Sequence, residues 1–165
     1  MSKLGNHDMN DAFNIYVKQL RGGETEHLNE SLPPDFLGIN EKDLAFKDNV
    51  CVEGDAYLAD NELILHLNIA ANAIVPCAIC NEDVDVEIAI EDFYHAVPLS
   101  EVKTGIYNLS DILRETILLE VPAIAECQGD CPRRKDVQKY MKTKKSATRG
   151  DADDDEGYRP FADLN

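Results

Sequence analysis

The chain lacks a long hydrophobic run. No stretch of its 165 residues approaches the roughly 20 consecutive apolar residues that a membrane-spanning helix requires. The first residues, MSKLGNHDMNDAF, contain neither an apolar segment of signal-peptide length nor a small-residue cleavage site. These absences predict a cytoplasmic protein that makes no membrane contact.

Signatures of common enzyme classes are missing as well. The sequence contains no Walker loop, no G-x-G-x-x-G turn and no G-x-S-x-G elbow. The four histidines show no metal-binding spacing, and none of the 32 acidic residues forms a pair marked out for acid–base catalysis. We therefore expect a protein that is not an enzyme and takes no small-molecule substrate.

Basic residues are scarce outside one segment. Sixteen Lys and Arg residues face 32 acidic ones, which gives a formal net charge of −16. Residues 133–149 hold eight basic residues and one acid, so this segment carries +7 and the remainder −23. A body so acidic repels nucleic acid and attracts basic proteins, which confines any phosphate contact to 133–149. The alternative is that this segment is a solvated tail without a partner.

Tryptophan is absent and aromatic residues make up only 7% of the chain, but 44% of its residues are apolar. A chain of this length and composition can bury an ordinary core, so a metal need not hold the whole fold. Between Asn49 and Val97, apolar and polar residues alternate in successive runs. This alternation predicts strands, and their short connections predict an antiparallel meander.

Weaker patterns precede the meander. Residues 13–20 are predicted to form a strand with Phe13, Ile15 and Val17 on one face. Residues 24–29 are polar and are predicted to form a helical turn, which the prolines that follow must end.

A helix is predicted over residues 109–121, where apolar residues recur at helical spacing. Asn108 or Ser110 can cap its first turn, and Pro122 stops it. The predicted fold class is therefore α+β. We expect an antiparallel sheet or partly open barrel with this one amphipathic helix packed on it, followed by a flexible C-terminal tail.

The charge pattern divides the chain into three parts. Residues 1–141 are predicted to form the α+β domain, and residues 142–157, with opposed charge blocks and few apolar residues, a disordered linker. Apolar residues return in 158–165 as a Pro-Phe-x-x-Leu motif containing Phe161 and Leu164. We interpret this motif as an anchor that docks on its own body or on a partner; the alternative is a frayed tail.

Five cysteines are present, and four fall into two close pairs, Cys77-x-x-Cys80 and Cys127-x-x-x-Cys131. A reducing cytosol disfavours structural disulfides, so paired cysteines indicate metal or redox chemistry. Four soft ligands suit a structural zinc ion or an iron–sulfur centre. Four cysteines also close the coordination sphere, which argues against catalysis by the metal. Cys51 is left over, and we expect it to be a packed thiol rather than a ligand.

Two other readings of the cysteines remain open. Cys77 and Cys80 can form the dithiol of a thiol–disulfide enzyme, although such sites place the first cysteine at a helix N-terminus and here a strand follows. Alternatively the cysteines are ordinary buried thiols in an acidic adaptor that binds proteins without a metal.

The order of these features resembles that of one protein family. The Cys-x-x-Cys turn is followed by an acidic strand at 83–92, the stretch IYNLSDILRETILLEVP at 106–122, the second cysteine pair, and RPFADL at 159–164. This order is similar to that of the YceD-like family, the large ribosomal RNA subunit accumulation proteins of bacteria and plastids. The similarity is strongest at 77–131 and at 158–164, and Cys77, Cys80, Cys127 and Cys131 match by position.

The resemblance implies a non-enzymatic role in ribosome biogenesis, in which the protein supports accumulation of large-subunit ribosomal RNA. Together with the charge distribution, it predicts a basic ribosomal protein or assembly factor as the partner, with limited ribosomal RNA contact through 133–149. The residues expected to contact RNA or a partner are Arg133, Arg134, Lys135, Lys139, Phe161 and Leu164.

Overall fold

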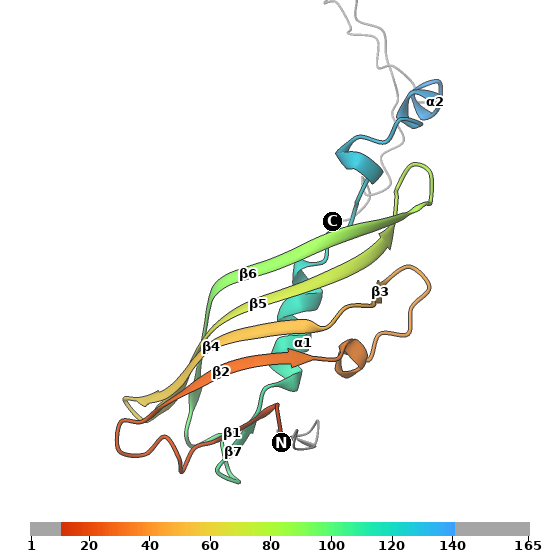
Figure 1. The fold of residues 1–165 in the computed structure, drawn as a ribbon. Helices are drawn as coiled ribbons and strands as arrows, with labels where there is room; N and C mark the ends of the chain where they lie inside the picture. The colour runs from red at the N-terminus through yellow and green to blue at the C-terminus, as the bar shows by residue number, and fades with distance from the viewer. Residues whose placement is uncertain (1–10, 141–165) are drawn as a thin grey trace, which may run out of the picture.

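A computed structural model describes residues 11–140 of the chain, and an antiparallel sheet of five strands is its largest part (Figure 1). These strands are β2 (Thr25–Leu32), β3 (Ala45–Phe46), β4 (Val50–Ala59), β5 (Glu62–Pro76) and β6 (Asp83–Pro98). In space the order is β2, β4, β5, β6, and β3 pairs with the far part of β5 on the side of β4. Among the described residues β2 and β6 do not pair with each other, so the sheet is open. Of the two predicted architectures, the open antiparallel sheet is confirmed.

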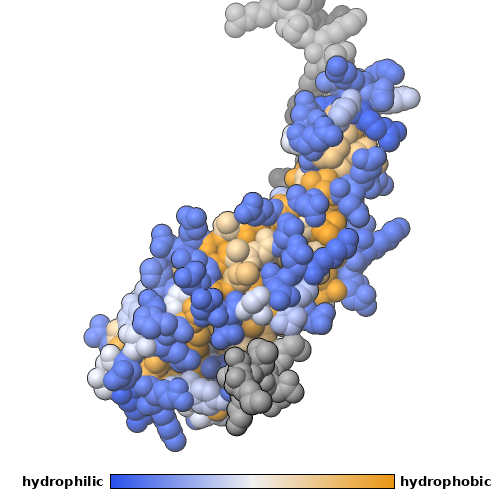
Figure 2. All heavy atoms as spheres, viewed as in Figure 1, coloured by the Kyte–Doolittle hydropathy of each residue, from blue (hydrophilic) through white to orange (hydrophobic). Residues whose placement is uncertain are grey.

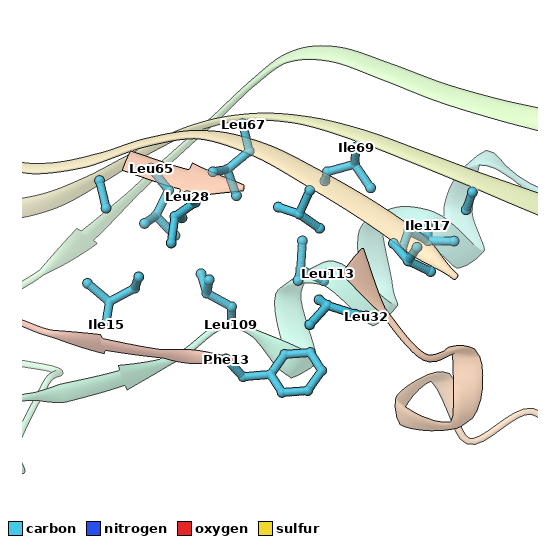
Figure 3. Packing of buried hydrophobic residues seen from close by; sticks show 14 of the residues in the cluster. Phe13, Ile15, Leu28, Leu32, Leu65, Leu67, Ile69, Leu109, Leu113 and Ile117 are labelled. Carbon is cyan, nitrogen blue, oxygen red and sulfur yellow. The ribbon is translucent and has the colours of Figure 1, made fainter. Parts of the chain in front are cut away.

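One face of this sheet is covered by a helix and a two-stranded sheet (Figures 1 and 3). The small sheet pairs β1 (Asn14–Tyr16) with β7 (Ile106–Asn108), and α1 (Ser110–Glu120) follows directly. Shorter helices are η1 (Pro34–Leu37), η2 (Cys127–Gly129) and α2 (Arg134–Gln138). The predicted α+β class is therefore confirmed. Within residues 11–140, none of the helices is long and apolar enough to cross a membrane.

Side chains from the two layers meet in one core (Figure 3). Leu113 and Ile117, four residues apart on one face of α1, are fully buried. Alternate residues of β5 point toward them, because successive side chains of a strand face opposite sides. Burial of each such side chain stabilises the fold by about 1.5–3 kcal/mol. The labelled core residues are Phe13, Ile15, Leu28, Leu32, Leu65, Leu67, Ile69, Leu109, Leu113 and Ile117.

The predicted helix is confirmed, and it ends before Pro122 as predicted, but its N-cap residue is Leu109 rather than Asn108 or Ser110. The side-chain oxygen of Asn108 accepts the backbone N–H of Ser110 at 3.0 Å and so satisfies one of the free donors of the first turn. Val121, which precedes Pro122, has extended backbone angles, as the residue before a proline prefers. Arg114 donates to the carbonyl oxygen of Leu37 at 2.7 Å and holds α1 against η1.

The helical turn predicted at 24–29 is wrong, because residues 25–29 belong to β2. This strand pairs with β4 along its whole length, from Thr25 opposite Tyr57 to Leu32 opposite Val50. Leu28 and Leu32 lie on the same side of the strand and are buried. Their spacing of four suits a strand as well as a helix, and the neighbouring strand decides between the two.

The strand predicted at 13–20 is shorter than expected. Only Asn14–Tyr16 is a strand, and turns follow it. Phe13, Ile15 and Val17 are nevertheless all buried, as the alternation predicted.

The middle of the large sheet contains a β-bulge in β6 and, on the other side of β5, an unusually close approach of β4. Leu67 pairs with Phe93 and Ile69 with Ile90, so Asn68 faces two residues of β6, which is a β-bulge. Across β5 from this bulge, Gly54 of β4 lies opposite Leu67. A Cβ atom at Gly54 would lie 2.1 Å from the carbonyl oxygen of His66. Only glycine therefore permits this close approach of β4 to β5.

Two predicted parts of the chain lie outside the described residues. They are the linker at 142–157 and the docking motif at 158–165, which contains Phe161 and Leu164. The basic residues from Lys142 to Arg149 lie outside as well.

Candidate metal centre

The first cysteine pair lies in the turn that joins β5 to β6, as the sequence predicts. The backbone N–H of Cys77 donates to the carbonyl of Glu82 at 2.8 Å, and that of Asn81 to the carbonyl of Cys77 at 2.9 Å. Asn81 has a left-handed backbone (φ 63°), which asparagine tolerates better than most residues. These bonds close the turn tightly and set Cys77 and Cys80 on its inner side, within reach of one ion.

The second pair is brought to this turn by the segment that follows α1. Ala125 pairs in parallel with Cys77, and its carbonyl accepts the N–H of Ala78 at 2.9 Å. The chain then reverses through two left-handed residues, Gln128 (φ 58°) and Gly129 (φ 75°). In Figure 1 the segment after α1 accordingly runs up to the β5–β6 turn before it enters α2. The helix, as predicted, brings the second pair beside the first.

The four sulfurs form one compact cluster. The Sγ atoms of Cys77, Cys80, Cys127 and Cys131 all lie within 4.8 Å of one another. Cys80 Sγ and Cys127 Sγ are 3.7 Å apart, and all the cysteines are free thiols. Sulfurs bound tetrahedrally to zinc at ~2.3 Å are separated by about 3.8 Å, whereas a disulfide needs about 2.05 Å. The donor set and spacing therefore fit a four-sulfur metal site.

The cluster is sheltered from water. Cys77 and Cys131 are 0% and 2% exposed, and Cys80 and Cys127 are half-buried. Partial exposure of Cys80 and Cys127 would give an ion access to the cluster, and burial of Cys77 and Cys131 would shield a bound ion from solvent.

Backbone donors already favour a negative charge at one sulfur. The N–H of Cys127 donates to Cys77 Sγ at 3.4 Å. This bond, followed by those from the N–H groups of Cys80 and Ile79, lowers the pKa of Cys77 to about 6. The hydrogen bond to Cys131, together with burial, instead raises the pKa of Cys127 to about 12. Several negative sulfurs cannot coexist here without a cation, so a metal ion would displace the remaining protons as it binds.

Glu126 links the loop that carries Cys131 to Arg134. Its Oε2 accepts the backbone N–H of Cys131 at 3.2 Å and the Nε–H of Arg134 at 3.2 Å. A second ion pair joins Glu126 Oε1 to the guanidinium, and Asp130 lies 3.3 Å from Arg134 Nε. Arg134, predicted as a partner contact, is therefore engaged within the protein and anchors α2 to the cysteine loop. The sequence gives no signal for Glu126 beyond its position next to Cys127.

Replacing Glu126 by alanine is expected to loosen the metal without removing a ligand. Loss of groups that orient metal ligands costs about 10–100-fold in metal affinity, so a metal ion held by the four cysteines should pass to a chelator about tenfold faster. Asp130→Ala is the matched control, because the Asp130 side chain is 84% exposed and pairs with the same arginine. Equal release rates in the wild type and Glu126→Ala would show that Glu126 does not position the loop.

The other predicted contact residues that the structure describes lie in α2 or directly beside it. Arg133, Lys135 and Lys139 are exposed, and Lys139 Nζ lies 3.4 Å from Asp136 Oδ1. In Figure 1, α2 lies beyond the β5–β6 turn, near the end of the described part of the chain.

Cys51 is outside the cluster, but the expectation of a packed thiol is wrong. The residue is exposed. Odd-numbered positions of this part of β4 point to the face opposite α1, where Cys51 lies beside Glu53 and Ala70 in a shallow hollow. A thiol follows the alternation of its strand, and here the alternation directs it outward.

Comparisons of the chain with protein-family models, with curated proteins and with solved structures find no match, so the resemblance to the YceD-like family stays a prediction.

Proposed function

We propose that the cysteine cluster binds one structural zinc ion and that the protein acts without catalysis, as a binding factor in biogenesis of the large ribosomal subunit. The carrying observation is that four thiol sulfurs from two distant segments lie within 4.8 Å of one another. Four cysteines fill the tetrahedral sphere of zinc and leave no position for substrate. Zinc would then act as a clamp, that is, it would hold the two cysteine-bearing segments together.

The clamp has a clear mechanical consequence. It joins the β5–β6 turn to a loop that lies 46 residues further along the chain, counted from 81 to 126. Cys131 is followed within three residues by Arg134, so holding the loop also holds α2. The exposed cations of α2 are thereby presented at a defined place relative to the sheet.

One observation favours the redox alternative. The pKa of Cys77 is lowered to about 6 by backbone N–H donors, which is a property of reactive thiols. A thiol–disulfide enzyme, however, also needs its nucleophile within reach of a substrate, and Cys77 is 0% exposed. The same donors serve equally well to stabilise a metal-bound thiolate, so burial favours the structural site.

The ribosomal part of the proposal is supported by the resemblance and by the charge distribution. Residues 11–132 contain 24 acidic and six basic residues, whereas 133–149 carries +7. An acidic body suits a basic ribosomal protein or assembly factor, and the adjoining basic segment suits phosphate. A protein of this kind contacts a ribosomal precursor through both surfaces, with ribosomal RNA touched only by 133–149.

Neutralising the basic segment is expected to abolish RNA binding. The test variant replaces the segment's basic residues by glutamine but keeps Arg134, which anchors the loop. At about 150 mM salt the wild type should bind a large-subunit RNA fragment weakly, with affinity that falls as salt rises, and the variant should not bind. Affinity is measured by fluorescence anisotropy across a salt series. The substituted residues are Arg133, Lys135, Lys139, Lys142, Lys144, Lys145 and Arg149.

The control replaces Lys18, Lys103 and Arg21 of the acidic body by glutamine, and it should bind RNA as the wild type does. Tight RNA binding by the segment variant would show that the body itself recognises RNA.

The ribosomal role is tested separately in the source organism, where loss of the protein should lower the ratio of large-subunit to small-subunit ribosomal RNA. An unchanged ratio contradicts it.

A further inference from the structure

A groove lies beside the metal centre, between the loop before β3 and the segment that follows α1. It has a volume of about 290 Å³, and Cys77, Ala78 and Asn81 of the first cysteine turn are part of its lining. Ile124 on its wall is 73% exposed, although its neighbours are apolar. Figure 2 shows hydrophobic residues at the surface where the sheet narrows toward α2. The apolar lining residues are Leu44, Val75, Pro76, Val121, Pro122 and Ile124.

A second hollow of mixed charge adjoins the groove. It has a volume of about 340 Å³ and shares Leu44, Val75 and Pro76 with the groove. Two lysines, Lys42 and Lys47, and two acids, Asp43 and Asp83, line it, so its lining carries no net charge. Charge therefore does not select an occupant for this region, whereas the apolar wall of the groove suits an apolar segment.

The chain itself contains an apolar segment beyond the described residues, since residues 158–165 read YRPFADLN. We propose that 158–165 docks in this groove of the same molecule, with Phe161 and Leu164 against its apolar wall. This inference does not depend on the proposed ribosomal role.

The chain is long enough for this return. Cys131 lies in the sulfur cluster with Cys77, which lines the groove. The nine residues from Cys131 to Tyr140 span at most about 30 Å, whereas the 20 residues 141–160 span up to about 66 Å when extended. Phe161 can therefore reach the groove without strain.

Attachment to the same chain also favours the docked state. Tethering a segment to the molecule that carries its site gives it an effective concentration that can reach the millimolar range near that site. An interaction too weak to persist between separate molecules is then well populated within one molecule. Pro160, which has a fixed φ, reduces the conformational freedom that docking of its neighbour removes.

Amide hydrogen exchange on the full chain tests the proposal. Phe161→Ala/Leu164→Ala should speed exchange at residues 121–125 and at Leu44 by about tenfold or more, without changing exchange in the core of β5. A synthetic peptide of residues 158–165, added at about 1 mM, should restore the protection. The same peptide with both substitutions should not restore it.

A matched pair of groove variants completes the test. Ile124→Glu should abolish protection by the peptide, whereas Leu119→Glu, at an equally exposed position on α1 outside the groove, should leave it intact. Equal exchange in the wild type and the double variant overturns the proposal, and so does peptide protection that maps elsewhere. Protection that rises with protein concentration, together with a dimer mass, assigns the groove to a second copy and overturns docking within one molecule.

Discussion

Replacing Cys131 by serine is expected to abolish stoichiometric zinc binding. The purified wild-type chain should contain about one zinc ion, and its four cluster thiols should resist alkylation until a chelator is added. A serine hydroxyl is a poor zinc ligand at neutral pH, so three sulfurs and a hydroxyl should lose the ion to a chelator that leaves the wild type loaded.

The loss should unfold one part of the protein and leave the rest intact. The core between the large sheet and α1 contains no ligand cysteine and is stabilised by its own buried side chains. The loop from Glu126 to Arg134, however, is held to the β5–β6 turn at the cluster. Amide exchange should therefore accelerate in η2 and α2, while residues in the middle of β5 keep their protection.

Cys51→Ser is the control, since Cys51 is exposed and lies outside the cluster. It should keep the full zinc content and protection, with one fewer reactive thiol. Inductively coupled plasma mass spectrometry measures the metal and also identifies iron if iron is bound instead. Unchanged metal content in Cys131→Ser would contradict the site. No metal and four inert thiols in the wild type would favour the adaptor without metal.

Replacing Gly54 by alanine is expected to be the most damaging single substitution in the large sheet. The new Cβ would lie 2.1 Å from the carbonyl oxygen of His66 and 2.8 Å from Leu67 Cα. Both are backbone atoms of β5, which cannot turn aside as a flexible side chain can. The strands must separate, and the free energy of unfolding should fall by about 3 kcal/mol.

The control for Gly54→Ala is Gly38→Ala. Gly38 has a left-handed backbone (φ 59°) that also disfavours a side chain, but nothing lies within 4 Å of its added Cβ. This variant should lose only about 1 kcal/mol, the usual cost of that conformation. Urea denaturation measures both. Similar losses in the two variants would show that close approach of β4 to β5 is not what requires glycine.

The elements with a strong repeating pattern were predictable from the sequence. The alternation of β4, β5 and β6 and the helical spacing of Leu113 and Ile117 each reflect a contact with one core, and such patterns need only local reading. The stop at Pro122 was predictable for the same reason. β2 was not, because its two inward leucines at a spacing of four are compatible with either helix or strand.

The distortions in the centre of the sheet could likewise not be predicted from the sequence. At the bulge, β6 contains one extra residue, Asp92. The residues that face the core are therefore even-numbered before the bulge, as at Ile88, and odd-numbered after it, as at Val97. A simple alternation cannot continue through such an insertion. Gly54 looks like an unfavourable residue within a strand until the position of its neighbour is known.

The sequence by itself determined the ligand types of the candidate centre, the spacing within each cysteine pair, and the separation of acidic body from basic segment. Residue identity and short spacing carry that information directly. Only the tertiary structure decided that the two pairs meet, that Glu126 and Arg134 hold the second pair in place, and that Cys51 faces solvent. These facts depend on how a helix and two strands pack across 46 intervening residues, and contacts between distant segments leave no local pattern in a single sequence.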